Sequence, residues 1–337
     1  MRRRWSRIAV VMSILAVVLG ATACSSYESD ELLIYNAQHE SLTKEWVDAF
    51  TKETGIKVTY RQGGDTELGN QLVAEGAGSP ADVFLTENSP AMAAVERAGL
   101  FADLEADTID QVPAQYRPAT GKWTGVAART TVFVYNKTRL QPDQLPKSLL
   151  DLQQPAWKGR WGAPPTKADF QAIVAALLQF KGEPATAQWL AGMKANAKIY
   201  NDNIATLKAV NAGEVDGGVI YHYYWFRDQS KTKEMSGNTE LHYFRNEDPG
   251  AFVSLSGGGV LKSSKKLEQA QQFLRFITGK SGQEVLEKGT SFEYPVASDV
   301  PANPALPSLN TLQAPAVDPS TLDAHKVSDL MTKDGLL

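Results

Sequence analysis

Short apolar runs alternate with amphipathic stretches from residue 32 onward, and this alternation constrains the fold more than any other feature. Leu42, Trp46 and Phe50, for example, share one face of a helix that ends before Gly55. The elements predicted in this part are a strand at 32–35, that helix, a strand at 56–60, a helix at 67–75, a strand at 81–85 and a helix from 89. Strands that alternate with helices predict an α/β domain with a largely parallel sheet.

A second α/β stretch follows the strongest strand signal of the chain, residues 131–135. We predict helices at 167–180, 184–196 and 205–212, a strand at 218–221, a strand at 251–254, and helices at 265–278 and 282–288. Gly257, Gly258 and Gly259 are interpreted as a tight turn. The proline-rich residues 301–319 are expected to run extended over the surface.

The first residues have the pattern of an export signal. Four arginines precede an almost wholly apolar run at residues 8–21, which is shorter than the ~20 residues of a membrane span. Small residues directly precede Cys24, the only cysteine of the chain. We predict a signal peptide at 1–23 and a lipid anchor on Cys24 with a tether at 24–31. The alternative is a plain signal peptide with a chance cysteine.

Length and charge limit the function classes. Removal of residues 1–23 leaves 337 − 23 = 314 residues, which is long for one core and suggests two domains. The leader carries four arginines and no acid, so the net charge changes from −4 to −4 − 4 = −8. Because no long basic run is present, nucleic acid is not expected as a partner.

Enzyme motifs are absent from the sequence. It contains no G-x-S-x-G, no Walker A loop, no G-x-G-x-x-G and no H-E-x-x-H, since Thr43 stands where the second histidine of the last motif is needed. We therefore predict a binding protein rather than an enzyme. A secreted enzyme that uses His39 and Glu87 as an acid/base pair is a further hypothesis.

Side chains that ligate hard cations follow several of the predicted strands. His39 comes after the first strand and Glu87 after the strand at 81–85, while Tyr223 and Tyr224 follow the strand at 218–221. The carboxyl ends of strands border the ligand crevice in open α/β sheets, so these residues could face one cleft. Singly, each has an ordinary alternative: a surface histidine, a solvated glutamate, or an aromatic core or stacking cluster that binds a sugar or another organic ligand.

The chemistry of these four side chains favours a trivalent cation. Tyrosine is a poor ligand at neutral pH because its pKa is about 10, but a trivalent cation can displace the proton. Two phenolates and one carboxylate supply three negative charges, with His39 neutral. This set cancels the charge of ferric iron and leaves a surplus on a divalent ion.

The chain resembles the bacterial periplasmic ferric-ion-binding proteins, also called bacterial transferrins. The resemblance covers nearly all of the mature chain, and its most specific segments are "YNAQH" at 35–39 and "YYW" at 223–225. "TGIKV" at 54–58 and "PADVF" at 80–84 are less specific; "WKG" at 157–159 and "DPGA" at 248–251 also match.

This resemblance implies a two-lobed periplasmic-binding-protein fold, with hinge strands near Thr131 and Ser254 and a ligand cleft between the lobes. We expect one lobe at 32–130 plus 255–304 and the other at 131–254 plus 305–337. The implied iron ligands are His39, Glu87, Tyr223 and Tyr224. The implied partners are an ABC permease and its ATPase, met by a monomer held at the outer face of a membrane or in a periplasm. The alternative ligand in the same fold is an organic cation, a sugar or a phosphonate.

The sequence departs from the family at the anion that completes the iron site. Many members hold phosphate at a helix N-terminus, where Lys167 and Asp169 stand here. Asp169 would repel an anion, Tyr221 replaces an asparagine and Asn88 replaces a glutamine, while Asn203 still matches. We expect an altered anion such as carbonate, or none, with Lys167, Asn203, Arg129 and Asn88 as candidate contacts. Tyr221 is expected to pack, with a third phenolate as the alternative.

Overall fold

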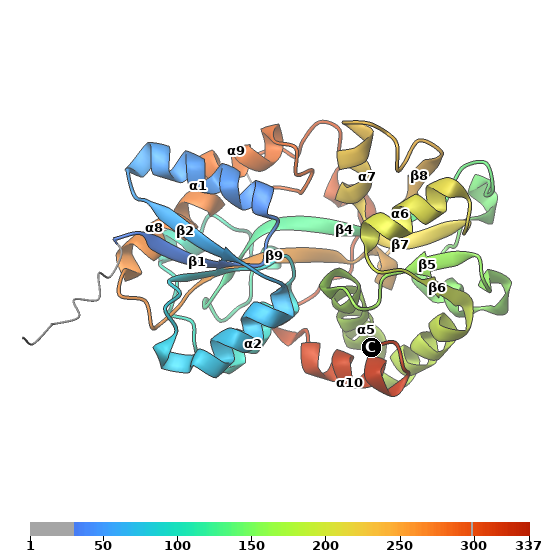
Figure 1. Cartoon of the computed structure of the whole chain (residues 1–337), viewed down its shortest axis with the longest axis horizontal. Coiled ribbons are helices and arrows are strands. Elements are labelled where there is room, and N and C mark those ends of the chain that lie inside the picture. The colour runs from blue at the N-terminus through green and yellow to red at the C-terminus, as the bar shows by residue number, and fades with distance from the viewer. Residues whose placement is uncertain (1–29, 298) are drawn as a thin grey trace, which may run out of the picture. The chain divides into compact units, whose positions relative to one another are not determined.

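The computed structural model describes residues 30–297 and 299–337, which contain a mixed sheet of nine strands. The strand order is β2-β1-β3-β9-β4-β7-β5-β6, with β8 paired to β4. Figure 1 shows this sheet with helices on both of its faces. The predicted signal peptide, Cys24 and most of the predicted tether lie outside the described residues.

Parallel strands form the first half of the sheet. β1 (Leu32–Asn36) pairs in parallel with β2 (Val58–Gln62) and β3 (Val83–Leu85). The connecting helices are α1 (Glu40–Thr54) and α2 (Asp65–Glu75), and α3 (Ser89–Arg97) follows β3. Leu42, Trp46 and Phe50 are buried on α1 as their spacing predicts, and the Phe50 ring meets Phe273 of α8 (Leu267–Thr278) at 5.2 Å. The name first half is used below for these strands (β1, β2 and β3) together with the helices α1, α2, α3, α8 and α9 (Lys280–Lys288).

The second half repeats the arrangement. β5 (Trp161–Ala163) is parallel to β6 (Ala197–Ile199) and β7 (Gly217–Tyr221). Its helices are α5 (Ala168–Asn196), α6 (Asn203–Ala212) and α7 (His222–Gln229). Gly182, with φ of 76°, interrupts α5, and Pro184 follows the interruption. The two helices predicted at 167–180 and 184–196 are therefore the two arms of α5.

Two long strands join the halves. β4 (Thr124–Asn136) pairs antiparallel with β9 (Val253–Val260), β9 continues to β3, and β4 continues to β7 and to β8 (Thr239–His242). Figure 1 shows β4 and β9 running from one half toward the other. The largely parallel sheet that we predict is therefore found in the outer strands, and the centre is antiparallel. Short apolar runs identify strands but do not show that a strand crosses between two halves.

The prediction of a turn at Gly257, Gly258 and Gly259 is wrong, because all three lie inside β9. A Cβ at Gly258 would lie 2.9 Å from the Val126 side chain, and one at Gly259 would lie 2.6 Å from Phe101. The glycines are needed because neighbouring side chains pack directly on the backbone of this strand.

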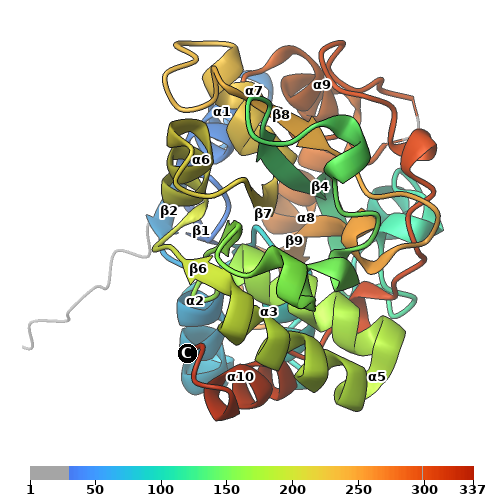
Figure 2. The ribbon, with the colours of Figure 1, turned by 90° about the vertical axis from the view of Figure 1, so that its right-hand side faces the viewer.

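The C-terminal segment contacts both halves. Its helix, α10 (Ala324–Lys333), was not predicted from the sequence pattern. One further short helix, α4 (Ala106–Ile109), precedes β4. The Asp323 carboxylate caps α10, whose Val327, Leu330 and Met331 are buried. Figures 1 and 2 show α10 beside α5, and the turn at Pro319–Thr321 packs on α3.

Residues Glu31 to Leu337 together form one compact unit. The boundaries predicted for the two lobes stay a prediction. In the described part of the chain, no helix combines the length and the apolar character needed to cross a membrane.

Candidate metal-binding site

The four predicted metal ligands come from both halves and lie together. His39 directly precedes α1 at the end of β1, and Glu87 follows β3, so the ends of two parallel neighbours carry them. Tyr223 and Tyr224 occupy the first turn of α7, directly after β7. The His39 ring meets the Tyr223 ring edge-on at 5.1 Å and the Tyr224 ring at 6.2 Å.

His39 is held as a neutral imidazole. Burial, together with the positive charges of Arg129 and Arg227, lowers its pKa to about 3. Its Nδ1 lies 3.0 Å from the Glu87 carboxylate, which accepts the single imidazole proton. Nε2 has no hydrogen-bond partner among the described residues. A carboxylate on one ring nitrogen and a free lone pair on the other is the arrangement of metal-binding histidines.

The two tyrosines share one carboxylate acceptor, that of Asp169 in the first turn of α5. The Tyr223 hydroxyl donates to Asp169 Oδ2 at 3.3 Å and the Tyr224 hydroxyl donates to the same oxygen at 3.1 Å. Burial, then the negative charge of Asp169, raises the pKa of both phenols well above its usual value of 10. Both phenols therefore keep their protons until a cation takes the place of those protons.

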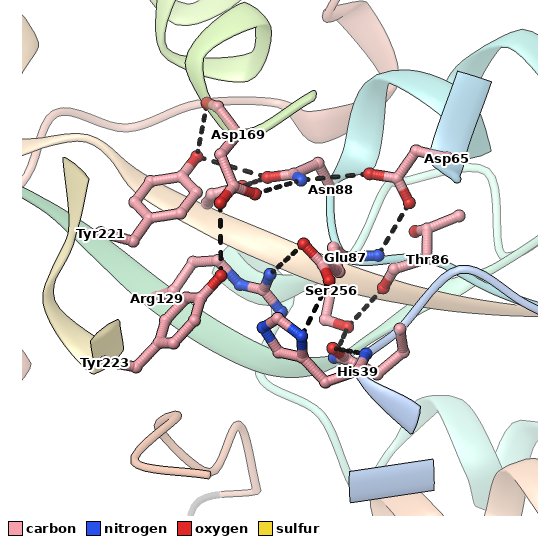
Figure 3. A network of polar contacts seen from close by, with 12 residues as sticks. His39, Asp65, Thr86, Glu87, Asn88, Arg129, Asp169, Tyr221, Tyr223 and Ser256 are labelled. Carbon is pink, nitrogen blue, oxygen red and sulfur yellow. Dashed lines mark hydrogen bonds and ion pairs between the residues drawn. The ribbon is translucent and has the colours of Figure 1, made fainter. Parts of the chain in front are cut away.

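Arg129 on β4 lies beside two of the donors, Glu87 and Tyr223. Its Nη2 pairs with the buried Glu293 carboxylate at 2.5 Å, and its Nη1 lies 3.8 Å from Glu87. Its guanidinium carbon lies 5.4 Å from the centre of the Tyr223 ring (Figure 3). The pKa of Glu87 is raised well above its usual value by burial and by Asp169, and Arg129 opposes this shift.

Three of the four residues predicted to contact an external anion instead contact Asp169 or Glu293. Asn203 donates to Asp169 Oδ2 at 2.8 Å, and Asn88 donates to Asp169 Oδ1 at 2.9 Å, as Figure 3 shows for Asn88. Arg129 is engaged by Glu293, whereas Lys167 is exposed at the start of α5. The Tyr221 hydroxyl, buried, lies 3.2 Å from the Asp169 carbonyl oxygen.

Sequence reasoning missed the role of Asp169. It treated the residue only as a charge that repels an anion. In the structure this carboxylate is itself the anion around which Asn88, Asn203 and both tyrosines converge, at the N-terminus of α5. The available signal was its position, because a helix N-terminus favours a negative side chain as well as a bound anion.

A cavity of about 800 Å³ opens in front of these residues. His39, Glu87, Asp169, Asn203 and Tyr224 are among the residues that line it. Within residues 30–297 and 299–337, His, Cys, Asp and Glu alone form no group of three that could hold a metal. A metal site here therefore depends on the tyrosines.

Comparisons with known proteins identify the family of the chain. Residues 78–319 match a family described as bacterial extracellular solute-binding proteins. The chain is 59% identical over 330 residues to the Fe(3+)-binding periplasmic protein of Serratia marcescens, covering 98% of this chain and 97% of the relative. It is 36% identical over 309 residues to the major ferric iron-binding protein of Neisseria meningitidis serogroup B, covering 91% and 93%.

A solved structure is similar in fold. Iron-bound HitA from Pseudomonas aeruginosa matches with a TM-score of 0.85 and 41% identity, over 91% of this chain and all of the other. The predicted periplasmic-binding-protein fold is confirmed. The chain belongs to the family of bacterial extracellular solute-binding proteins.

Proposed function

We propose that this protein captures ferric iron outside the cytoplasm and delivers it to an ABC-type importer. The observation that carries the proposal is that two adjacent tyrosines, a neutral histidine and two carboxylates meet beside one cavity. The two relatives, an Fe(3+)-binding periplasmic protein and a major ferric iron-binding protein, support the same ligand. These relatives favour ferric iron over an organic ligand, which is the alternative in the same fold.

The donor chemistry fits a hard trivalent ion. Metal binding would displace the phenol protons of Tyr223 and Tyr224, and Glu87 would supply a carboxylate. The Nε2 lone pair of His39 is free to ligate. Asp169 would add a fourth negative charge to the three that cancel Fe(III). Arg129 lies beside Glu87 and Tyr223, and its positive charge offsets part of this surplus. The offset is only partial because Arg129 also pairs with Glu293.

Asp169 would replace an external anion. Its side chain already lies against both tyrosine hydroxyls and takes the hydrogen bonds of Asn88 and Asn203. An added anion would have to compete with this covalently attached carboxylate for the same donors. Of the two outcomes expected from the sequence, an altered anion or none, the contacts favour none.

Iron capture would take place between two lobes. The predicted lobes, 32–130 plus 255–304 and 131–254 plus 305–337, would be the two moving parts, and the paired strands β4 and β9 would connect them. Closure about hinges near Thr131 and Ser254 would bring His39 and Glu87 onto the tyrosines and exclude water. The C-terminal segment, which contacts α3 as well as α5, would limit this motion.

The protein would act as an exported binding protein without catalysis of its own. Periplasmic relatives support export and partnership with a permease and its ATPase. A lipid on Cys24 would hold the monomer at a membrane surface. Mass spectrometry of the mature protein tests the anchor, since a free Cys24 thiol would contradict it.

One titration tests the ligand. Ferric citrate added to the metal-free protein should produce a visible charge-transfer band from iron bound to phenolate. The double variant Tyr223→Phe/Tyr224→Phe should stay colourless while it remains folded. A colourless wild type, or a coloured double variant, would contradict the proposal.

A further inference from the structure

Every hydrogen-bonding site on the Asn88 side chain is occupied. Its amide nitrogen donates to Asp65 at 3.1 Å and to Asp169 at 2.9 Å. Its amide oxygen accepts the hydroxyl of Ser254 at 3.0 Å and lies 3.3 Å from the Tyr221 hydroxyl. Only 1% of the residue is exposed. Figure 3 shows Asn88 between the two aspartates.

These contacts connect the two halves of the protein. Asn88 precedes α3, and Asp65 begins α2 in the same half. Asp169 lies on α5 and Tyr221 on β7, both in the second half, and Ser254 lies on the strand β9 that joins them. A single side chain therefore bonds to both halves and to the connecting strand.

The chemistry of the surroundings requires an amide at this position. In their ionised forms Asp65 and Asp169 only accept, so the residue between them must donate twice, and the two hydroxyls need an acceptor. A carboxylate at position 88 would place three acids together. An apolar side chain would remove one hydrogen-bond donor from each of the buried carboxylates of Asp65 and Asp169. A buried charged group that loses a hydrogen-bond partner destabilises the folded protein.

Asp65 extends the same assembly to another predicted ligand. Its second carboxylate oxygen accepts the backbone N–H of Glu87 at 2.9 Å. The chain of contacts Glu87–Asp65–Asn88–Asp169 thus runs from a metal donor of one half to a metal donor of the other.

We propose that Asn88 is a positioning residue that fastens the closed cleft and sets the distance between Glu87 and Asp169, so that bound iron is released slowly. This role rests on the proposed iron-binding function. Asn88 touches the donors rather than the ion, and the orange-red colour expected of the tyrosine-bound iron would not depend on it.

The test compares Asn88→Ala with Asn203→Ala. Each variant removes one donor to the Asp169 carboxylate, but Asn203 lies on α6 in the same half as Asp169 and connects nothing across the cleft. Iron release from the loaded protein into excess chelator is followed through the visible band. X-ray scattering of the metal-free proteins reports the opening of the cleft.

We expect release from Asn88→Ala to be about 10- to 100-fold faster than from wild type, the range for losing hydrogen bonds to buried charged groups. The absorption maximum should not move, and the metal-free variant should have a larger radius of gyration. Asn203→Ala should stay compact and release iron more slowly than Asn88→Ala.

An unchanged release rate in Asn88→Ala, or an equal acceleration in Asn203→Ala, would overturn the proposal. If Asn88→Ala does not fold, Asp65→Asn weakens the other end of the same assembly and should also accelerate release. A wild type that shows no iron band would refute the iron function. The scattering comparison would still decide whether Asn88 holds the halves together.

Discussion

The two halves contribute opposite kinds of donor to the candidate site. In the first half, His39 is neutral with a free Nε2, so it can ligate without losing a proton. In the second half, Tyr223 and Tyr224 are protonated and bonded to Asp169, so they ligate only when a cation displaces their protons. From this difference we infer that selectivity for a strongly acidic trivalent ion would reside in the second half, while the first half would add affinity.

Loss of a tyrosine should have the largest effect. Tyr223→Phe or Tyr224→Phe should lower ferric affinity by more than about 1,000-fold, or about 4 kcal/mol, because a charged ligand is removed. His39→Ala should lower affinity less and keep the colour. Equilibrium competition against a chelator measures each variant.

Tyr221→Phe is the matched control for these tyrosine variants. Its hydroxyl contacts Asn88 and the Asp169 backbone, so the visible band should persist. A shifted or weakened band in Tyr221→Phe would indicate that Tyr221 is a third phenolate.

Arg129 should matter for folding more than for colour. Arg129→Met leaves the fully buried Glu293 carboxylate without its partner and should lower the free energy of unfolding by about 3 kcal/mol. The double variant Arg129→Met/Glu293→Gln should regain most of that loss. Chemical denaturation measures both, and equal stability of the single variant and wild type would contradict this role.

Asp169→Asn tests whether the second half supplies its own anion. The substitution keeps the shape and removes the charge, so ferric affinity should fall about 10- to 100-fold, about 1.4 to 2.7 kcal/mol. Added bicarbonate or phosphate should restore part of the affinity in the variant and change nothing in wild type. Dependence of the wild type on either anion would count against the internal carboxylate.

The smallest expected effect is a pH dependence of the metal-free fold. Burial raises the pKa of Asp65 to about 7 from 3.8, so the folded protein binds more protons than the unfolded chain between these values. Relative to Asp65→Asn, the stability of the wild type should therefore rise by about 1 kcal/mol between pH 8 and 6.5. His39 and His222, each with a pKa lowered to about 3, oppose the rise equally in both proteins, because the unfolded chain binds protons at these residues from about pH 7 downward and the folded protein does not. Calorimetry of wild type and Asp65→Asn measures the difference, and an equal rise in both would contradict the assignment.

Sequence patterns predicted the parts of the site that depend on strand ends. His39 follows β1 and Glu87 follows β3, and these two strands are parallel neighbours. Because the carboxyl ends of parallel strands lie at the same edge of the sheet, the strand pattern alone brings the two side chains together. The helix α7 was not predicted, because a run of aromatic residues has low helix propensity and Tyr221 gives no side-chain cap.

The contacts of Asp169 and Asn88 depend on how the two halves meet. Asp169 lies 81 residues from Asn88 and 54 from Tyr223 along the chain. Charge sign alone suggested repulsion at position 169, whereas the direction of its side chain makes the carboxylate an acceptor for four neighbouring residues, Asn88, Asn203, Tyr223 and Tyr224. Such directions come from tertiary packing and not from local pattern.

The most direct measurement of the central claim is an iron titration of the wild type in buffer free of bicarbonate, phosphate and citrate, with a weakly bound iron source. The account predicts a visible phenolate band that saturates at one iron per chain without any added anion. A band that appears only after an anion is added, or no band at all, would contradict it.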